Sequence, residues 1–454
     1  MAIGWPRSIQ PSPLPVVALR RQLSWLDATA VFVGIVLGSG IFIAPAEIAG
    51  AISSPLWATS LWLVGACIAV CGAFCYAECG ARLPQPGGFF IFYREVYGPG
   101  FAFVAGWAAL FVTYPASLAA ISLIFARYLN EIFPGIAATD LGAALAGAAA
   151  LVLVAILNII GVKLGAGVQK ALTTFKVLAL VTLCVAAFLS PAAPAASASV
   201  APLELLPKGL FGILGAMVVL LWTFDGWSDM SMMAGELRNP SKDLGRAVLV
   251  GITILAATYM VVQYATMSLL GSAAAASSNQ VVAQAVGVGL GSTAARTVAL
   301  LVVISTLGSL NGIVLAASRL AFAMARNRAF FTWFGEVHPR FETPARSTLV
   351  LVVAALTYVS ISNFRDLMGF FAFNIWLLYS ATAIALLKLR RLKVGEPLQW
   401  HAPLGIFPPL VVLLTGAGMT LGLLVQSPLR SAIGLGMLLF ALPVYWGWMA
   451  FQKQ

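Results

Sequence analysis

Charged residues are scarce in this sequence. Asp, Glu, Lys and Arg make up 9% of its 454 residues, whereas a soluble domain usually carries about 25%. Hydrophobic residues reach 61%, and the mean hydropathy is +0.97. A soluble globular protein is therefore excluded, and the many apolar runs of roughly 20 residues predict membrane-spanning helices. The alternating strand segments that mark an outer-membrane barrel are not seen.

Histidine and clustered carboxylates are also lacking. The two histidines, His338 and His401, fall in expected loops, and the 15 acidic residues are scattered along the chain. A membrane enzyme would need such groups together at one membrane depth. The sequence therefore predicts no catalytic residue, no bound metal and no cofactor, in a protein that is not an enzyme.

Cysteine is confined to apolar segments. Cys67, Cys71, Cys75 and Cys79 recur at every fourth residue of one segment, and Cys184 stands alone. Twelve helical residues extend about 18 Å, so these four thiols cannot converge on one zinc ion with bonds near 2.3 Å. Small, polarizable residues on a packing face are the better interpretation. Because no expected loop contains cysteine, we expect no structural disulfide.

The net charge of +11 follows membrane topology rather than nucleic-acid binding. The first twenty residues are polar and Pro-rich and lack the pattern of a removable signal peptide, which indicates a cytosolic tail. Of the 26 Lys and Arg residues, 20 fall on the side of both termini, so the positive-inside rule predicts cytosolic termini. Twelve spans are expected, at 25–51, 55–80, 98–129, 141–162, 171–190, 209–234, 247–271, 295–325, 346–362, 366–388, 404–426 and 431–450.

Two of these spans are interrupted in mid-membrane. The first contains GIVLGSGIFIAP (34–45), in which Gly38, Ser39 and Gly40 are consecutive weak helix formers, and the sixth contains Asp225-Gly226. Five spans separate their starting points, so the two run in opposite directions. Interrupted segments at corresponding positions of two halves indicate a transporter built from inverted repeats. The alternative for the first break is a glycine-based helix contact.

An interrupted helix offers a way to bind a zwitterion. Non-helical backbone is tolerated at membrane depth only where it is buried in protein or lines a cavity. The opened turn exposes N–H groups that favour an anion and C=O groups that favour a cation. Two crossing interrupted helices could therefore hold the carboxylate and the ammonium of a free amino acid without an ionised side chain.

Four motifs carry a resemblance to a known family. The segments GSGIFIAP (38–45), PQPGG (84–88), FDGWSDMSMMAGELRNP (224–240) and ASRLAFAMARNRAFF (317–331) resemble signatures of the amino acid–polyamine–organocation superfamily, especially its L-type and bacterial amino acid permeases. The similarity covers residues 22–450.

The resemblance implies an all-α integral membrane protein with 12 transmembrane helices, in a LeuT-type 5+5 inverted repeat with spans 1 and 6 unwound. The expected units are a cytosolic tail (1–23), repeat one with spans 1–5 (24–190), an extracellular linker (191–208), repeat two with spans 6–10 (209–393), spans 11 and 12 (404–450) and a cytosolic C-terminus (451–454).

The resemblance also implies a substrate site made of backbone. The N–H groups of Ser39 and Gly40 are expected to bind the substrate carboxylate, with Gly38 opening the turn. The ammonium is expected on carbonyls in both interrupted spans, those of Val36, Trp222, Thr223 and Asp225. Trp222 matches the aromatic gate that closes over substrate; its alternative role is that of a membrane-interface aromatic.

Two ionisable side chains add to this expectation. Asp225 departs from the family pattern, and it could bind a cationic side chain, carry a proton or accept nearby backbone N–H groups; Asp229 could share its role or line the cytosolic vestibule. Lys176 matches a lysine of sodium-independent relatives that stands near the sodium position of sodium-coupled ones. It is expected to tether span one near Ser305, Thr306 or Ser309, and its alternative is a snorkelling lysine.

Other polar residues are less specific. Glu78 near Arg82, and Glu236 near Arg238, fit either an intracellular gate network or a solvated helix end. Asn311 is expected to be a packing or hydrogen-bonding residue. Human L-type light chains are joined to a heavy chain by a cysteine between spans three and four, whereas residues 130–140 have none, so we expect no disulfide-linked heavy chain and a bacterial inner membrane.

These observations predict sodium-independent transport of amino acids, first of all neutral L-amino acids, across the plasma membrane by alternating access, as an exchanger or uniporter. A proton-coupled symporter and a carrier of cationic amino acids or polyamines remain as alternatives. A membrane enzyme is the rival from another class, and a channel lined by the two breaks is a further competitor.

Overall fold

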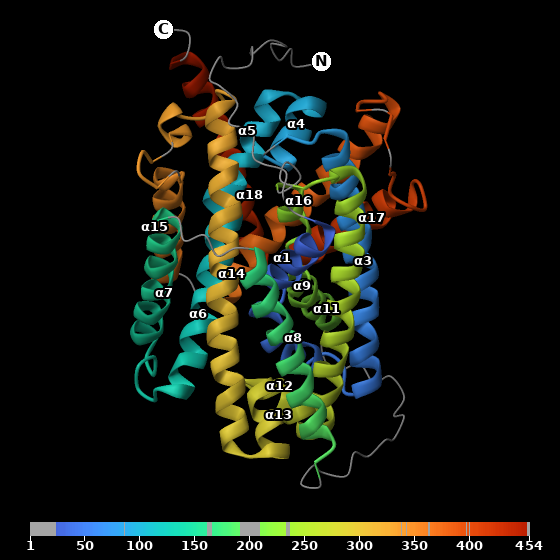
Figure 1. The fold of residues 1–454 in the computed structure, drawn as a ribbon, viewed down its shortest axis with the longest axis vertical. Helices are drawn as coiled ribbons and strands as arrows, with labels where there is room; N and C mark the ends of the chain where they lie inside the picture. The colour runs from blue at the N-terminus through green and yellow to red at the C-terminus, as the bar shows by residue number, and fades with distance from the viewer. Residues whose placement is uncertain are drawn as a thin grey trace.

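The computed structural model describes residues 24–85, 87–160, 166–190, 209–232, 237–336, 338–341, 343–361, 364–395, 397–398 and 400–451. Within these ranges the chain is helical and contains no β-strand. Long helices such as α3 (Pro55–Arg82), α11 (Pro240–Leu270) and α14 (Ser292–Arg326) run along the long axis of the molecule (Figure 1). The prediction of an all-α architecture is confirmed for this part of the chain.

The remaining elements follow one another along the chain. The first half contains α1 (Trp25–Val36), η1 (Gly40–Phe42), α2 (Ala44–Ala49), α4 (Phe89–Tyr97), α5 (Pro99–Ala108), the π-helical η2 (Ala109–Thr113), α6 (Tyr114–Ile132), α7 (Asp140–Ile160) and α8 (Ala166–Phe188). The second half contains α9 (Gly209–Thr223), α10 (Trp227–Met232), α12 (Ser272–Ser277), α13 (Val281–Leu290), η4 (Thr332–Gly335), α15 (Ala345–Ile361), α16 (Phe364–Arg391), α17 (Phe407–Gln426) and α18 (Pro428–Phe451).

Nine helical runs among the described residues are long and apolar enough to cross a membrane. They are Pro55–Arg82, Pro99–Ile132, Asp140–Ile160, Gly212–Ser231, Lys242–Leu270, Ser292–Arg326, Gly369–Arg391, Phe407–Val425 and Pro428–Ala450. The protein is therefore a multi-pass membrane protein. Each of the twelve ranges expected as spans contains helix, and the first, fifth and ninth contain shorter apolar helices.

The segment 272–294, which lies between two of the expected spans, is largely helical. It contains the short helices α12 and α13 and the start of α14, and Gly291, which has a φ of +85°, separates α13 from α14. A ten-residue helix such as α13 is too short to span a bilayer, so a search for long apolar runs does not detect it. Its buried face packs on the membrane-spanning helices, with Val281 and Val282 fully buried.

Both predicted helix breaks are present. The first helix ends at Val36 and resumes as η1 and α2, and the second ends at Thr223 and resumes at Trp227 as α10. Gly226 lies in the second break with a φ of +131°, which L-residues with a side chain rarely adopt. The two breaks lie against each other, because a Cβ on Gly40 would come within 2.8 Å of the Thr223 Cα.

Candidate functional site

A buried cavity lies where the two breaks meet α6, α14 and α16. It offers about 50 Å³ to the centres of water molecules. Its lining combines backbone of the breaks with an apolar wall and several hydroxyl groups: Ile35, Val36, Gly38, Ser39, Gly40, Phe89, Ala109, Thr113, Tyr114, Ser117, Ile121, Trp222, Thr223, Asp225, Ser228, Asp229, Ser309, Ile313, Phe371, Ile375 and Leu378. All seven residues that the sequence suggested for substrate binding therefore lie around one cavity.

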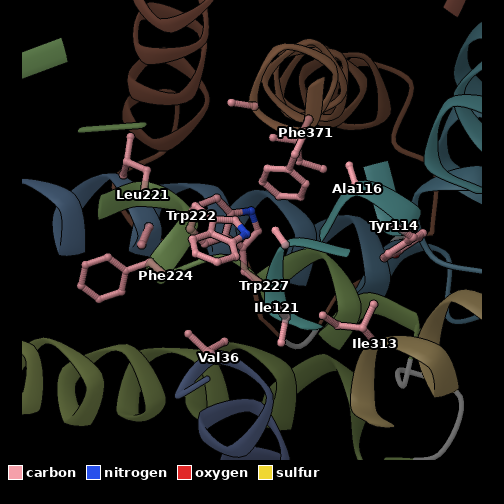
Figure 2. Packing of buried hydrophobic residues seen from close by; sticks show 14 of the residues in the cluster. Val36, Tyr114, Ala116, Ile121, Leu221, Trp222, Phe224, Trp227, Ile313 and Phe371 are labelled. Carbon is pink, nitrogen blue, oxygen red and sulfur yellow. The ribbon is translucent and has the colours of Figure 1, made fainter. Parts of the chain in front are cut away.

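The apolar wall comes from four different parts of the chain. Figure 2 shows Val36 of α1, Ile121 of α6, Trp222 of α9 and Phe371 of α16 in one buried cluster. Trp222 is only 8% exposed, so it does not lie at the membrane–water interface, where aromatic belts form. Its ring instead covers one side of the cavity.

The first break presents unused hydrogen-bond donors to this cavity. Within the described part of the chain, the N–H groups of Ser39, Gly40 and Ile41 have no hydrogen-bond acceptor, whereas the Phe42 N–H donates to the Ser39 carbonyl over 3.2 Å. Buried backbone N–H groups are nearly always paired. Two of these donors belong to Ser39 and Gly40, which line the cavity, and together they form a site suited to a carboxylate.

The carbonyl side of the site is already partly used. The Tyr259 hydroxyl of α11 lies between the carbonyls of Val36 and Thr223, at 3.3 and 3.1 Å, and shares its one proton between them. The Val36 carbonyl also accepts from the Gly38 N–H at 2.7 Å. Because a carbonyl oxygen has two lone pairs, the Thr223 carbonyl retains at least one acceptor position, whereas the Val36 carbonyl, which also accepts from Gly38, retains less capacity. The backbone acceptors open to an ammonium therefore lie on the side of the second break.

Tyr259 was not singled out in the sequence. The available signal was its place in the middle of an apolar span, which is too deep for an interface aromatic.

Phenylalanine at this position removes the hydroxyl that joins both breaks. A hydrogen bond is worth about 1 kcal/mol, so we expect amino acid uptake by Tyr259→Phe in proteoliposomes to fall roughly five- to tenfold. Tyr264→Phe on the same helix is the matched control, since Tyr264 is 37% exposed. Equal uptake by the two variants would exclude this role for Tyr259.

Two carboxylates also face the cavity, and each accepts a hydrogen bond from a tyrosine. Asp225 accepts from the Tyr379 hydroxyl of α16. Asp229 accepts from the Tyr114 hydroxyl of α6 at 3.0 Å and is 5% exposed. Neither lysine nor arginine is among the described residues that line the cavity. Two acidic groups without a basic partner make this a site that attracts positive charge.

Tyr114 is positioned by an irregular turn. Its N–H donates to the Ala109 carbonyl five residues earlier, which closes the π-helical segment η2. Single π-helical turns inside α-helices occur frequently at functional sites. Here the wide turn directs Ala109, Thr113 and Tyr114 toward the cavity.

Lys176 lies behind the first break rather than in the cavity lining. Its ammonium donates to the Ser305 carbonyl of α14 at 3.5 Å, and the side chain is 7% exposed. The Ser305 hydroxyl in turn donates to the Leu37 carbonyl at 2.8 Å, and the Ser309 hydroxyl donates to the Ile35 carbonyl at 3.0 Å. Lys176 is therefore linked through Ser305 to the first break. Thr306 instead bonds carbonyls of its own helix.

The structure also places the less specific residues. The Asn311 side chain accepts a hydrogen bond from the Asn158 side chain at 2.8 Å, so it is a hydrogen-bonding residue between packed helices. Glu236 lies outside the described residues. Glu78 is fully buried, so the interpretation as a solvated helix end is wrong for it. None of the five cysteines is in a disulfide, and among the described residues no three His, Cys, Asp or Glu side chains gather as metal ligands.

Comparison with known proteins covers nearly the whole chain. Residues 23–447 match the family model described as "Amino acid permease". The chain is 28% identical to the serine/threonine exchanger SteT of Bacillus subtilis (strain 168), over 94% of this chain and 97% of that protein. It is 26% identical to the b(0,+)-type amino acid transporter 1 of Homo sapiens, over 93% of this chain and 86% of that protein. It is 28% identical to the large neutral amino acids transporter small subunit 2 of Homo sapiens, over 94% of this chain and 80% of that protein. These relatives are transporters and not enzymes.

Proposed function

The chain belongs to the amino acid permease family, and we propose that it carries neutral L-amino acids across the plasma membrane without sodium, as an exchanger or uniporter. The observation that carries this proposal is the meeting of two interrupted helices at one buried cavity, with the open N–H groups of Ser39 and Gly40 on one side. Alternating access then moves the bound substrate from one side of the membrane to the other.

The proposed architecture has twelve spans in two inverted repeats. Repeat one comprises residues 24–190, repeat two comprises 209–393, and the last two spans follow at 404–450, with both termini in the cytosol. In support, α1 and α9 are each the first membrane helix of their half, and both are interrupted. The distribution of Lys and Arg supports the orientation.

The proposed binding mode uses the backbone of both breaks. The Ser39 and Gly40 N–H groups bind the substrate carboxylate, since they lie beside the cavity without acceptors. The ammonium lies on carbonyls of the second break, those of Trp222, Thr223 and Asp225, with Val36 nearby. Trp222 closes over the substrate as a gate, which its burial at the cavity wall supports.

Small neutral substrates fit the size of the cavity. A water needs about 10–15 Å³ of space for its centre, so 50 Å³ holds roughly three to five waters. Among amino acids, small ones such as alanine, serine and threonine come nearest to this size. The name of the bacterial relative, a serine/threonine exchanger, agrees with this size range.

Sodium independence is proposed from Lys176. Its ammonium is buried and linked through Ser305 to the Leu37 carbonyl beside the first break. A fixed positive charge at this place takes over the tethering that a bound sodium ion provides in sodium-coupled transporters, and it repels a second cation.

A second candidate function is favoured by the two carboxylates. Asp225 and Asp229 line a cavity with no basic side chain among its described residues, which suits a cationic amino acid, a polyamine or a transported proton. Strong competition by arginine, lysine or putrescine against alanine would favour this candidate over neutral transport.

The chain is proposed to work without a disulfide-linked heavy chain, in the inner membrane of a bacterium. Residues 130–140, between the third and fourth spans, contain no cysteine. The described cysteines are buried except Cys67, which lies within α3.

Uptake of radiolabelled alanine into proteoliposomes tests the function. In sodium-free buffer, uptake that requires amino acid inside the vesicles supports exchange, and equal uptake into empty vesicles supports uniport. Uptake that rises with an inward proton gradient would instead identify a proton symporter. No alanine uptake in any condition, together with binding of arginine or putrescine, would contradict neutral transport.

A further inference from the structure

A buried ion cluster lies at the end of α3, outside the substrate cavity. Glu78 has no exposed surface, and its carboxylate accepts from the Arg82 guanidinium at 2.9 Å and from the Arg390 guanidinium at 2.5 Å. It also accepts the Ala402 N–H at 2.8 Å. One carboxylate therefore joins α3, the last turn of α16 and the connection between α16 and α17.

The same connection is held by further bonds from the two arginines. Arg82 donates to the Val394 carbonyl at 2.9 Å, and Arg390 donates to the Gly405 carbonyl at 2.6 Å. Gly395, with a φ of +75°, lies so close to Arg82 that a Cβ there would come within 2.8 Å of the Arg82 Cα. The described residues of the connection are thus fastened near its start and near its end.

The connection also reaches a third helix. The Trp400 ring packs edge-on against Phe74 of α3, with centroids 5.8 Å apart, and a Cβ on Gly245 of α11 would come within 2.5 Å of that ring. In Figure 1 the orange connection between α16 and α17 lies at the same end of the molecule as the C-terminal end of α18. It crosses the ends of α3 and α11 at this end.

The helices that carry the cluster also shape the substrate site. Tyr76, two residues before Glu78 on α3, packs its ring perpendicular to Tyr379 of α16, with centroids 5.7 Å apart. Tyr379 donates to Asp225 in the second break. Separation of α3 from α16 would therefore change the cavity and would break the Glu78 cluster.

We propose that Glu78 is a positioning residue for transport, which latches the connection between α16 and α17 over the ends of α3 and α11 and releases it when the cavity opens toward this end. This proposal rests on the proposed function. In the described structure the cavity walls are buried, with Ser39 at 2% and Asp229 at 5% exposure, so helices must part at one end before a substrate leaves.

An ion cluster suits a latch that opens repeatedly. Charge-assisted hydrogen bonds are strong and directional inside the protein, yet each group regains hydration when the helices part and water enters. An apolar contact of similar strength would expose hydrophobic surface on every opening. Removing one partner alone leaves a buried charge uncompensated and weakens the closed state.

The test measures opening from each side of the membrane. The probe is Ser117→Cys, at a cavity residue on α6, in a protein whose five native cysteines are replaced by alanine. A membrane-impermeant thiol reagent is applied from either side of oriented proteoliposomes. We expect Glu78→Gln to increase labelling from the side of the connection about tenfold or more, since hydrogen bonds to charged groups contribute at least that factor. Labelling from the opposite side should not rise.

Matched variants separate latching from general instability. Arg346→Gln removes an ion pair with Glu336 that is exposed, and it should leave both labelling rates unchanged. Arg390→Lys keeps the charge but loses the two-pronged geometry, so it should give an intermediate rise even if Glu78→Gln does not fold. Glu78→Asp keeps the carboxylate charge, so its labelling rate should stay close to that of the parent protein.

The outcomes distinguish the two proposals. Unchanged labelling in both Glu78→Gln and Arg390→Lys, or an equal rise from both sides, would overturn the latch. Labelling needs no substrate, so a parent protein that fails to transport alanine but shows the one-sided rise would contradict the proposed function and leave the latch supported.

Discussion

Alanine in place of Gly40 should reduce amino acid uptake about 100-fold or more. A Cβ at this position would come within 2.6 Å of the Thr223 Oγ1 and 2.8 Å of the Thr223 Cα, distances that real Cβ atoms do not tolerate. The two breaks would have to move apart, and the open N–H groups would move with them. A displacement near 1 Å at a reacting or binding centre can cost roughly 100-fold.

Gly418→Ala is the matched control for this prediction. Gly418 lies on α17, and apart from its chain neighbours and the backbone of its own helix no described atom lies within 4 Å of the position its Cβ would take. The control should transport normally and be slightly more stable, because alanine is the better helix former. Uptake is measured with both proteins reconstituted at equal density, and folding is checked by size-exclusion chromatography. Normal uptake by Gly40→Ala would show that the breaks do not hold the substrate.

Methionine in place of Lys176 should have the second-largest effect. The change keeps an unbranched side chain of similar length but removes the buried ammonium that bonds the Ser305 carbonyl. Hydrogen bonds to charged groups contribute about 1.5–3 kcal/mol, so uptake should fall roughly 10- to 100-fold. The loss should already appear in sodium-free buffer, because we propose that the Lys176 ammonium takes the place of a sodium ion.

Lys242→Met near the start of α11 is the control, since this lysine is exposed at a helix end. The parent protein should transport equally well in sodium and in choline buffer. If Lys176→Met takes up amino acid at the parent rate, Lys176 does not act as a tether for the first break. A parent protein that requires sodium would contradict the proposed mechanism.

The spans and breaks could be predicted because their signals are local. A run of apolar residues predicts a membrane helix wherever it folds, and Gly38-Ser39-Gly40 and Asp225-Gly226 interrupt such runs visibly. The structure contains both interruptions, at the positions expected.

Side-chain partners could not be predicted, because they depend on helices that meet only in space. Nothing near Glu78 in the sequence indicates Arg390, which lies 312 residues away and makes the carboxylate a buried cluster centre. The Tyr259 hydroxyl, which joins the two breaks, and the Tyr114–Asp229 bond belong to the same class. Helix rotation decides such contacts, and hydrophobicity alone does not determine it in spans that are apolar on every side.

Competition by substrate analogues tests most directly whether the two breaks bind both ends of an amino acid. Uptake of radiolabelled alanine is measured against excess alanine, alanine amide, which lacks the carboxylate, and propionate, which lacks the ammonium. The open N–H groups of the first break and the carbonyls of the second predict that only alanine competes. Competition by alanine amide or propionate as strong as that of alanine would contradict recognition by the two interrupted helices.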